Sequence, residues 1–138
     1  MKVREIMSKK VAWVGPDVPL KKAARKMRDM DIGCLPVGKN DRLVGMLTDR
    51  DIACRAVAKG WDATEKTVGE TMSKGITYCF DDQEISDAAQ LMERKCIHRL
   101  PVLNRKKRMV GILSLTDLGL HAPNRLTGKV VEVVGRRA

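Results

Sequence analysis

Two patterns of hydrophobic and polar positions follow each other along the chain, and their succession occurs twice. Short segments rich in β-branched and aromatic residues, 11–14 and 76–79, end at turn-forming residues and predict β-strands. An amphipathic helix is predicted after each segment, because apolar residues recur there at i, i+3, i+4 and i+7. These apolar positions are Leu20, Ala23, Ala24, Met27 and Met30 in the first copy, and Ile85, Ala88, Ala89 and Met92 in the second.

Each predicted helix is followed by two apolar segments around a polar loop, the pattern of a β-hairpin. The first hairpin is expected over 34–47 and the second over 99–113. A second helix is then expected in each copy, over 49–59 and 115–121. The repeating unit is therefore predicted to be β-α-β-β-α.

A tandem duplication explains this recurrence. Val3-Arg-Glu-Ile-Met-Ser-Lys9 reappears as Val68-Gly-Glu-Thr-Met-Ser-Lys74, at an offset of 65 residues. One extra residue in a later basic loop raises the offset to 66, so that Asp51 corresponds to Asp117. We predict a first repeat over 3–59, a linker over 60–67, a second repeat over 68–122 and a basic C-terminal tail over 123–138.

A repeat of this size can cover only one face of its sheet. The two repeats are therefore expected to need each other. The sequence predicts an α/β (α+β) fold in which two β-α-β-β-α repeats pack through their sheets with pseudo-twofold symmetry.

The charge balance adds a question about partners. The chain has 138 residues, of which 43% are hydrophobic and 32% charged, a globular composition. Its 27 Lys and Arg exceed its 17 Asp and Glu, which gives a formal net charge of +10. Such a charge indicates an anion: nucleic acid, a membrane surface or a phosphorylated small ligand. Aromatic residues make up only 3% of the chain, which disfavours single-stranded nucleic acid because its bases need stacking platforms.

Several other classes are disfavoured. No apolar run of about 18 residues is present, and the N-terminus does not have the pattern of a signal peptide. The four cysteines lack the spacing of a zinc knuckle or a redox motif, and we interpret them as small hydrophobic residues of a cytoplasmic protein. A Cys/His zinc site assembled in space stays open. The two histidines, His98 and His121, have no partner pattern for nucleophilic or metal chemistry, so we expect neither enzyme activity nor a required cofactor.

The order Met-Ser … Leu-Pro-Val … Val-Gly-hydrophobic-Leu-Thr/Ser-x-x-Asp, present twice, resembles a tandem pair of CBS domains, the Bateman module. The resemblance extends over residues 3–122, and Thr48-Asp-Arg-Asp-Ile52 is similar to short stand-alone bacterial members. It implies clefts between the repeats that bind an adenosine-containing ligand: AMP, ADP, ATP, NAD or S-adenosylmethionine. It also implies a regulatory sensor without catalysis, a homodimer and a regulated protein partner that the sequence does not identify.

The motifs Thr48-x-x-Asp51 and Ser114-x-x-Asp117 lie where a predicted strand turns into a helix. Backbone amides at such a turn favour a phosphate, and a carboxylate one turn further on can accept hydrogen bonds from two ribose hydroxyls. The resemblance assigns the ribose to Asp51 and Asp117, and the phosphate to Thr48 and Ser114. The same spacing also fits a capping box, which needs no ligand. The two interpretations are compatible, because a phosphate can displace a cap.

The copies differ just ahead of Leu-Pro-Val, where the first has Gly33-Cys34 and the second has His98-Arg99. The His-Arg pair resembles the phosphate-contacting pair of nucleotide-binding CBS domains, and Arg can hold a phosphate with a bidentate fork. We therefore predict that the cleft served by His98, Arg99 and Asp117 is the better phosphate site. A backbone partner for His98 and a carboxylate partner for Arg99 are the alternatives.

Four further positions are candidate ligand contacts. Arg50 is expected either to contact a phosphate or to be a solvated helix residue. By the resemblance, Ile76 and Thr77 lie near the adenine. Pro101 belongs to the candidate set too, although we expect it to shape the strand rather than to touch the ligand.

Non-specific binding of nucleic acid through its phosphates is the alternative function. It rests on basic clusters such as the helix face from Lys21 to Arg28 and the loop Arg105-Lys-Lys-Arg108. No helix-turn-helix or zinc-finger pattern accompanies these clusters, so a solvated surface is their ordinary interpretation.

Overall fold

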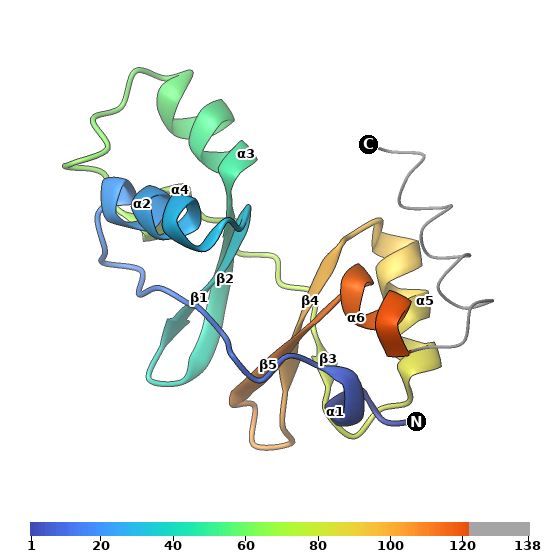
Figure 1. The fold of residues 1–138 in the computed structure, drawn as a ribbon. Coiled ribbons are helices and arrows are strands. Elements are labelled where there is room, and N and C mark those ends of the chain that lie inside the picture. The colour runs from blue at the N-terminus through green and yellow to red at the C-terminus, as the bar shows by residue number, and fades with distance from the viewer. Residues whose placement is uncertain (122–138) are drawn as a thin grey trace. The chain divides into compact units, whose positions relative to one another are not determined.

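The computed structural model describes residues 1–121, and the basic tail predicted over 123–138 lies outside the described residues. The chain divides into two compact units (Figure 1). The first unit is Ala12–Ile76, and the second unit combines Met1–Val11 with the chain from Thr77 onward. The first unit therefore contains the segment that opens the second sequence repeat, and the second unit contains the segment that opens the first repeat.

The first unit is built on a hairpin. Helix α2 (Leu20–Met30) precedes the antiparallel strands β1 (Cys34–Lys39) and β2 (Arg42–Thr48), in which Cys34 lies opposite Thr48. The turn residues Asn40 and Asp41 have φ angles of 54° and 61°, a left-handed conformation that Asn and Asp tolerate. The hairpin predicted over 34–47 is confirmed.

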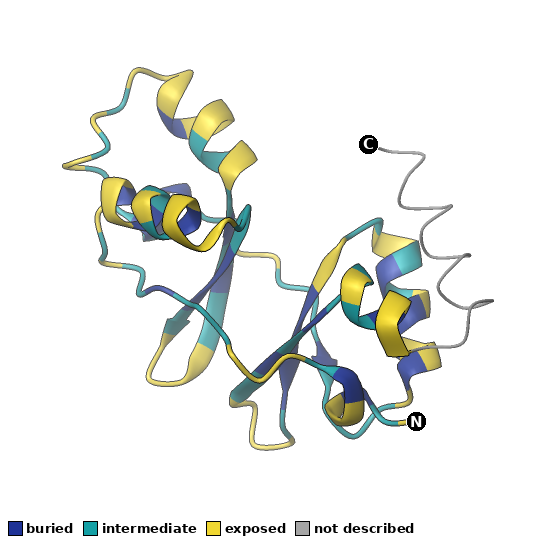
Figure 2. Ribbon diagram, viewed as in Figure 1, coloured by how far each residue is buried: buried dark blue, intermediate teal, exposed yellow. Residues whose placement is uncertain are grey.

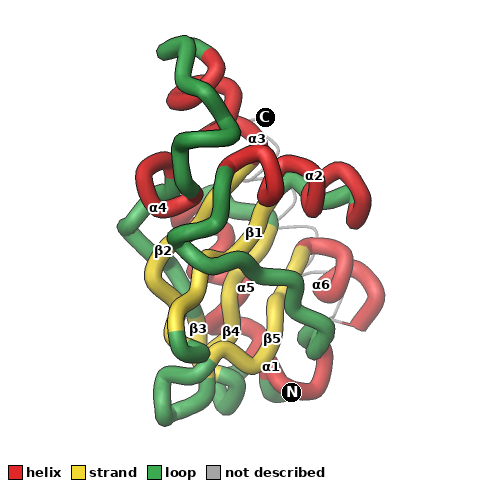
Figure 3. The backbone as a smooth tube through the Cα atoms, turned by 90° about the vertical axis from the view of Figure 1, so that its left-hand side faces the viewer, coloured by secondary structure: helices red, strands yellow, loops and turns green. Residues whose placement is uncertain are grey.

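After β2 the chain forms helix α3 (Asp49–Asp51), which continues as a π-helix, η1 (Ile52–Val57). The α-helix predicted over 49–59 is therefore wrong in type and extent. Hydrogen bonds of i→i+5 spacing replace the α-helical ones, as from the amide of Ala58 to the carbonyl of Ala53 at 3.0 Å. Helix α4 (Val68–Thr71) follows and contacts α2, β2 and η1. Figure 3 shows α4 beside β2.

The second unit holds a three-stranded sheet in the order β3 (Cys79–Phe80), β4 (Arg99–Leu103), β5 (Met109–Ser114). Strand β3 is parallel to β4, and β4 is antiparallel to β5. Helix α5 (Ile85–Lys95) connects β3 to β4, and helix α6 (Leu115–His121) follows β5. The N-terminal helix α1 (Val3–Ile6) packs against β5 and α6. The hairpin predicted over 99–113 and the helix predicted over 115–121 are confirmed.

The strands predicted over 11–14 and 76–79 are wrong in extent. In the first unit the segment contributes a single parallel bridge between Val14 and Val37. Pro16 follows two residues later and has no amide hydrogen to donate, which ends the pairing. In the second unit β3 begins only at Cys79, which lies opposite Val102.

Each unit has its own hydrophobic core (Figure 2). The predicted apolar stripe of α5 is buried along its length, and in α2 Leu20, Ala23 and Met27 are buried. Met30 is 50% exposed, so the buried stripe of α2 ends at Met27, one apolar position earlier than predicted. No helix within residues 1–121 has both the length and the apolar character needed to cross a bilayer.

An indole ring packs against the backbone of β1. A Cβ added at Gly38 would lie 2.0 Å from Cζ3 of Trp13, so a side chain at position 38 would displace the ring. Trp13 and Trp61 are the two tryptophans of the chain, and both belong to the first unit. Tryptophan fluorescence therefore reports on the first unit alone.

Candidate functional site

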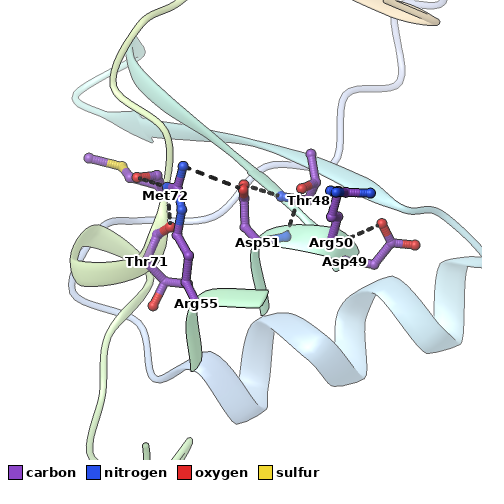
Figure 4. A network of polar contacts seen from close by, with 7 residues as sticks. All are labelled: Thr48, Asp49, Arg50, Asp51, Arg55, Thr71 and Met72. Carbon is purple, nitrogen blue, oxygen red and sulfur yellow. Dashed lines mark hydrogen bonds and ion pairs between the residues drawn. The ribbon is translucent and has the colours of Figure 1, made fainter. Parts of the chain in front are cut away.

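The first candidate site is the turn from β2 into α3, and its motif forms a closed capping box (Figure 4). The amide of Thr48 donates to Oδ2 of Asp51 at 3.0 Å, and the amide of Asp51 donates to Oγ1 of Thr48 at 3.0 Å. The structure thus confirms the capping interpretation for the first motif. The carboxylate of Asp51 is 14% exposed and remains within reach of solvent.

Arg55 joins this motif to α4, a role that the sequence analysis missed. Its Nη1 donates to the carbonyls of Thr71 at 3.0 Å and Met72 at 3.2 Å, and its Nη2 lies 3.9 Å from Oδ1 of Asp51. The available signal was its position four residues after Asp51, one helical turn further on. Arg55 thus binds the end of α4 to the same turn that holds the candidate ribose carboxylate.

A second carboxylate also belongs to the first motif. The amide of Asp49 donates to the carbonyl of Gly33 at 3.0 Å, and a Cβ at Gly33 would lie 2.9 Å from Oδ2 of Asp49. Glycine at position 33 therefore makes room for this carboxylate, which also accepts from the amide of Arg50 at 2.8 Å. In Figure 4 the side chains of Arg50 and Arg55 lie on opposite sides of Asp51. Arg50 is exposed.

The second candidate site, the turn from β5 into α6, repeats the capping box. The amide of Ser114 donates to Oδ2 of Asp117 at 2.8 Å, and the amide of Asp117 donates to Oγ of Ser114 at 3.1 Å. The hydroxyl of Ser114 also donates to Oδ2 of Asp117 at 3.0 Å. The two bonds that the carboxylate accepts both end on Oδ2, and no hydrogen bond to Oδ1 is present among the described residues.

The structure brings Arg99 and His98 to the second motif. Arg99 lies directly opposite Ser114 in the β4–β5 pair, so both side chains project from the same face of the hairpin. The carbonyl of His98 accepts from the amide of Leu115 at 3.1 Å, which fixes the backbone beside the motif. Both side chains are exposed, and Arg99 has no carboxylate partner among residues 1–121.

The remaining candidates lie further from the motifs along the chain. Pro101 is buried in β4 opposite Ile112, which agrees with a role in shaping the strand. Ile76 ends the first unit and Thr77 begins the return to the second, and both are half-buried. The structure places neither of them in a hydrogen bond with a motif residue.

The comparison with known families decides what these repeated turns belong to. The model of the CBS domain matches the chain twice, over residues 3–56 and 68–118. The chain belongs to the CBS domain family. It is 38% identical over 132 residues to hypoxic response protein 1 of Mycobacterium tuberculosis, covering 95% of this chain and 92% of that protein. It is also 38% identical over 119 residues to the CBS domain-containing protein YhcV of Bacillus subtilis, covering 86% of this chain and 84% of that one.

Solved structures of CBS domain pairs match the fold. The crystal structure of hypoxic response protein I with two coordinated zinc ions has a TM-score of 0.79 and 39% identity, covering 88% of this chain and 98% of that one. The CBS domain pair of protein MJ0100, in complex with 5′-methylthioadenosine and S-adenosyl-L-methionine, has a TM-score of 0.75 and 28% identity. The match covers 93% of this chain and 96% of that one. The predicted fold class, a mixed α and β arrangement of tandem CBS repeats, is confirmed.

The zinc ions of the first of these structures call for a test against the side chains of this CBS pair. Among residues 1–121, no three His, Cys, Asp or Glu side chains gather in an arrangement that would hold a metal ion. Of the four cysteines, Cys79 is buried, Cys54 is exposed, and Cys34 and Cys96 are half-buried. The described residues of this chain therefore do not fit such a zinc site.

Proposed function

We propose that this CBS pair is a non-catalytic sensor that binds an adenosine-containing ligand at its Thr/Ser-x-x-Asp turns. One observation carries the proposal. In both units a carboxylate and a hydroxyl are held at the same turn by the same reciprocal hydrogen bonds, although the two turns share few other side chains. A neighbour of the same fold was crystallised with two adenosine compounds, which supports this class of ligand.

The ribose is the part of the ligand that the carboxylates would recognise. In the second motif Oδ2 of Asp117 is occupied by the cap, whereas Oδ1 is left to accept from ribose hydroxyls. In the first motif the cap uses Oδ2 of Asp51, and Oδ1 has only the 3.9 Å contact with the half-exposed Arg55. A ligand would therefore add hydrogen bonds without breaking either capping box.

The phosphate groups of a nucleotide would favour the second motif. Arg99 lies opposite Ser114 and offers a guanidinium fork to a phosphate beside the ribose carboxylate. At the matching place the first motif has Cys34 opposite Thr48 and adds the carboxylate of Asp49, which repels a phosphate. Arg50 is the cation available there. We propose AMP, ADP, ATP or NAD for the second motif, with S-adenosylmethionine as the ligand that needs no phosphate group.

A thermal-shift panel of these five ligands tests the proposal. A ligand at a hundredfold excess over its Kd adds about 2.7 kcal/mol to the free energy of unfolding, which raises Tm by roughly 10 °C in a chain of this size. Asp51→Asn and Asp117→Asn keep an oxygen for the cap but weaken acceptance from a ribose hydroxyl. Each variant is expected to reduce the ligand-induced shift.

Glu70→Gln is the matched control, because Glu70 closes a third capping box with Thr67 that lies outside the proposed sites. It perturbs a cap in the same way and should leave the ligand-induced shift intact. The proposal fails if none of the five ligands moves Tm, or if Glu70→Gln reduces the shift as much as the two aspartate variants do.

The proposal includes four further properties of the sensor. The bound ligand is expected to be recovered unchanged, as mass spectrometry after incubation would show. We also expect the protein to form a homodimer and to regulate a protein partner. We expect it in the cytoplasm, where adenine nucleotides are abundant. Light scattering with and without ligand measures the oligomeric state, and a monomer under both conditions would remove the homodimer from the proposal.

A further inference from the structure

Helix α2 presents a row of cations that its counterpart in the other unit does not have. The basic residues of α2 are Lys21, Lys22, Arg25, Lys26 and Arg28, against a single acid, Asp29. Helix α5 occupies the same place after the duplication and has two acidic and two basic residues. Both helices bury an apolar stripe of the same spacing, so packing does not explain the difference.

The cations of α2 also oppose the stability of the helix. Its first turn contains no acid but does contain Lys21 and Lys22, near the positive end of the helix dipole. Helix α5 has the favourable distribution, with Asp87 in the first turn and Arg94 and Lys95 in the last. A charge pattern that disfavours the folded element points to a use outside the fold.

Two of these five cations have no partner within the described part of the chain. Arg28 pairs with Asp29 at 2.9 Å, and Lys26 donates to the carbonyl of Trp13 at 2.9 Å. Lys22 and Arg25 are exposed and form neither an ion pair nor a side-chain hydrogen bond with the described residues. They are therefore available to a polyanion.

Lys21 has one acid nearby. The pKa of Asp62 is lowered mainly by hydrogen bonds from Thr64 and, to a smaller extent, by the charge of Lys21. The charge of Lys21 is thus partly compensated.

We propose that the exposed basic face of α2 binds the phosphate backbone of double-stranded nucleic acid. On a helical wheel Lys21, Arg25 and Arg28 form one row, with Lys22 and Lys26 beside it. The row spans about 10 Å of helix, and a duplex strand has one phosphate per about 3.4 Å of axis, so about three phosphates face it.

Three other occupants fit this face less well. Membrane insertion needs several exposed apolar residues beside the cations, but the apolar stripe of α2 is buried as far as Met27, and Met30 is its one exposed apolar side chain. Single strands need aromatic stacking platforms, and α2 has no aromatic residue. The centre of a protein interface is depleted of charged residues, and of Lys in particular, whereas three of the five cations of α2 are Lys.

The test is fluorescence anisotropy of the full chain with a short labelled DNA duplex of mixed sequence. The double variant Lys22→Gln/Arg25→Gln removes two unpaired cations from α2. The matched control, Lys106→Gln/Lys107→Gln, removes two exposed cations from the β4–β5 loop of the second unit. Both variants have the same net charge, so a difference between them reports on the location of the charge.

We expect the wild-type affinity to fall about 40-fold between about 50 and about 200 mM salt, the response to about three phosphate contacts. The α2 variant should bind on the order of tenfold more weakly at the lower salt concentration, with a salt slope reduced by about two. Its Tm should be unchanged or raised, because a cation has been removed from the first turn. The control should stay within about twofold of the wild type.

Three results would overturn the proposal. One is wild-type protein that does not bind the duplex at the lower salt concentration. Another is an equal loss in both variants, which would assign binding to the net charge alone. The third is tighter wild-type binding to phosphatidylserine vesicles or to polyglutamate than to the duplex, with a loss confined to the α2 variant. That result would assign the face to a membrane or to an acidic protein. Adenosine-ligand binding is measured separately and is not affected by these outcomes.

Discussion

Arg55 should stabilise the first unit through its fork of hydrogen bonds rather than through its charge. A hydrogen bond from a charged donor contributes about 1.5 to 3 kcal/mol when it is buried. The side chain of Arg55 is 45% exposed, so competition from water reduces the stabilisation that each of its two hydrogen bonds to carbonyls contributes. The ion pair with Asp51 at 3.9 Å adds about 0.3 kcal/mol. We expect Arg55→Ala to lower the free energy of unfolding by about 2 kcal/mol.

Urea unfolding followed by tryptophan fluorescence measures this directly, because both tryptophans belong to the unit that contains Arg55. A loss of about 2 kcal/mol moves the midpoint by roughly 1 M urea. Arg55→Lys keeps the charge but not the fork, and it should lose about half as much. His121, the counterpart in the second repeat, provides the control, and His121→Ala should not move the fluorescence midpoint.

A midpoint of Arg55→Ala equal to that of the wild type would refute the role of Arg55 in binding α4. A midpoint of Arg55→Lys equal to that of the wild type would show that charge, and not the guanidinium fork, provides the stability. The π-helical turn gives a physical reason to expect the fork. It changes the direction of the side chains that follow the motif, and Arg55 thereby reaches the end of α4.

Three more predictions follow from single residues. Gly38→Ala should cost about 2 kcal/mol, because its methyl group meets an indole ring, whereas Gly75→Ala, with open space around it, should be neutral in the same urea titration. Burial, and to a smaller extent a nearby carboxylate, raises the pKa of Cys79 to about 12. Iodoacetamide at pH 8 should therefore label the exposed Cys54 first, and labelling of Cys79 without denaturant would contradict this. A hydrogen bond from the Arg105 guanidinium lowers the pKa of Asp82, so the ionised carboxylate stabilises the fold above about pH 4, and this contribution is lost as the pH falls. Asp82→Asn should therefore reduce the fall of Tm at acidic pH, and an unchanged fall would contradict this prediction.

The elements that depend on local periodicity were predictable from the sequence, and those that depend on distant partners were not. The stripes of α2 and α5 are visible as apolar spacing, and both hairpins are visible as two apolar segments around a polar loop. The extent of β3 is set by its pairing with Val102 and Leu103, which lie far along the chain. The exchange of the opening helices between the units is likewise a tertiary choice: α1 and α4 have the same local pattern.

The candidate site shows the same division. Reciprocal bonds within Thr48-x-x-Asp51 and Ser114-x-x-Asp117 follow from their spacing, so the cap was predictable. The position of Arg99 followed from aligning the repeats. Arg55 was missed because its partners are two backbone carbonyls of α4, and a backbone carbonyl leaves no signature in the sequence.

The closed caps determine where ligand affinity must come from. Each motif already satisfies its own amide and hydroxyl groups, so a ligand that only replaced those hydrogen bonds would gain little. A net gain requires groups that are exposed and unpaired before binding. At the second motif these are Oδ1 of Asp117 and the guanidinium of Arg99. At the first motif Arg50 is exposed, but Asp49 offsets its charge and Arg55 is already bonded to α4. Arg99→Ala should therefore weaken a nucleotide more than Arg50→Ala does, and equal losses would contradict the assignment of the phosphate to the second motif.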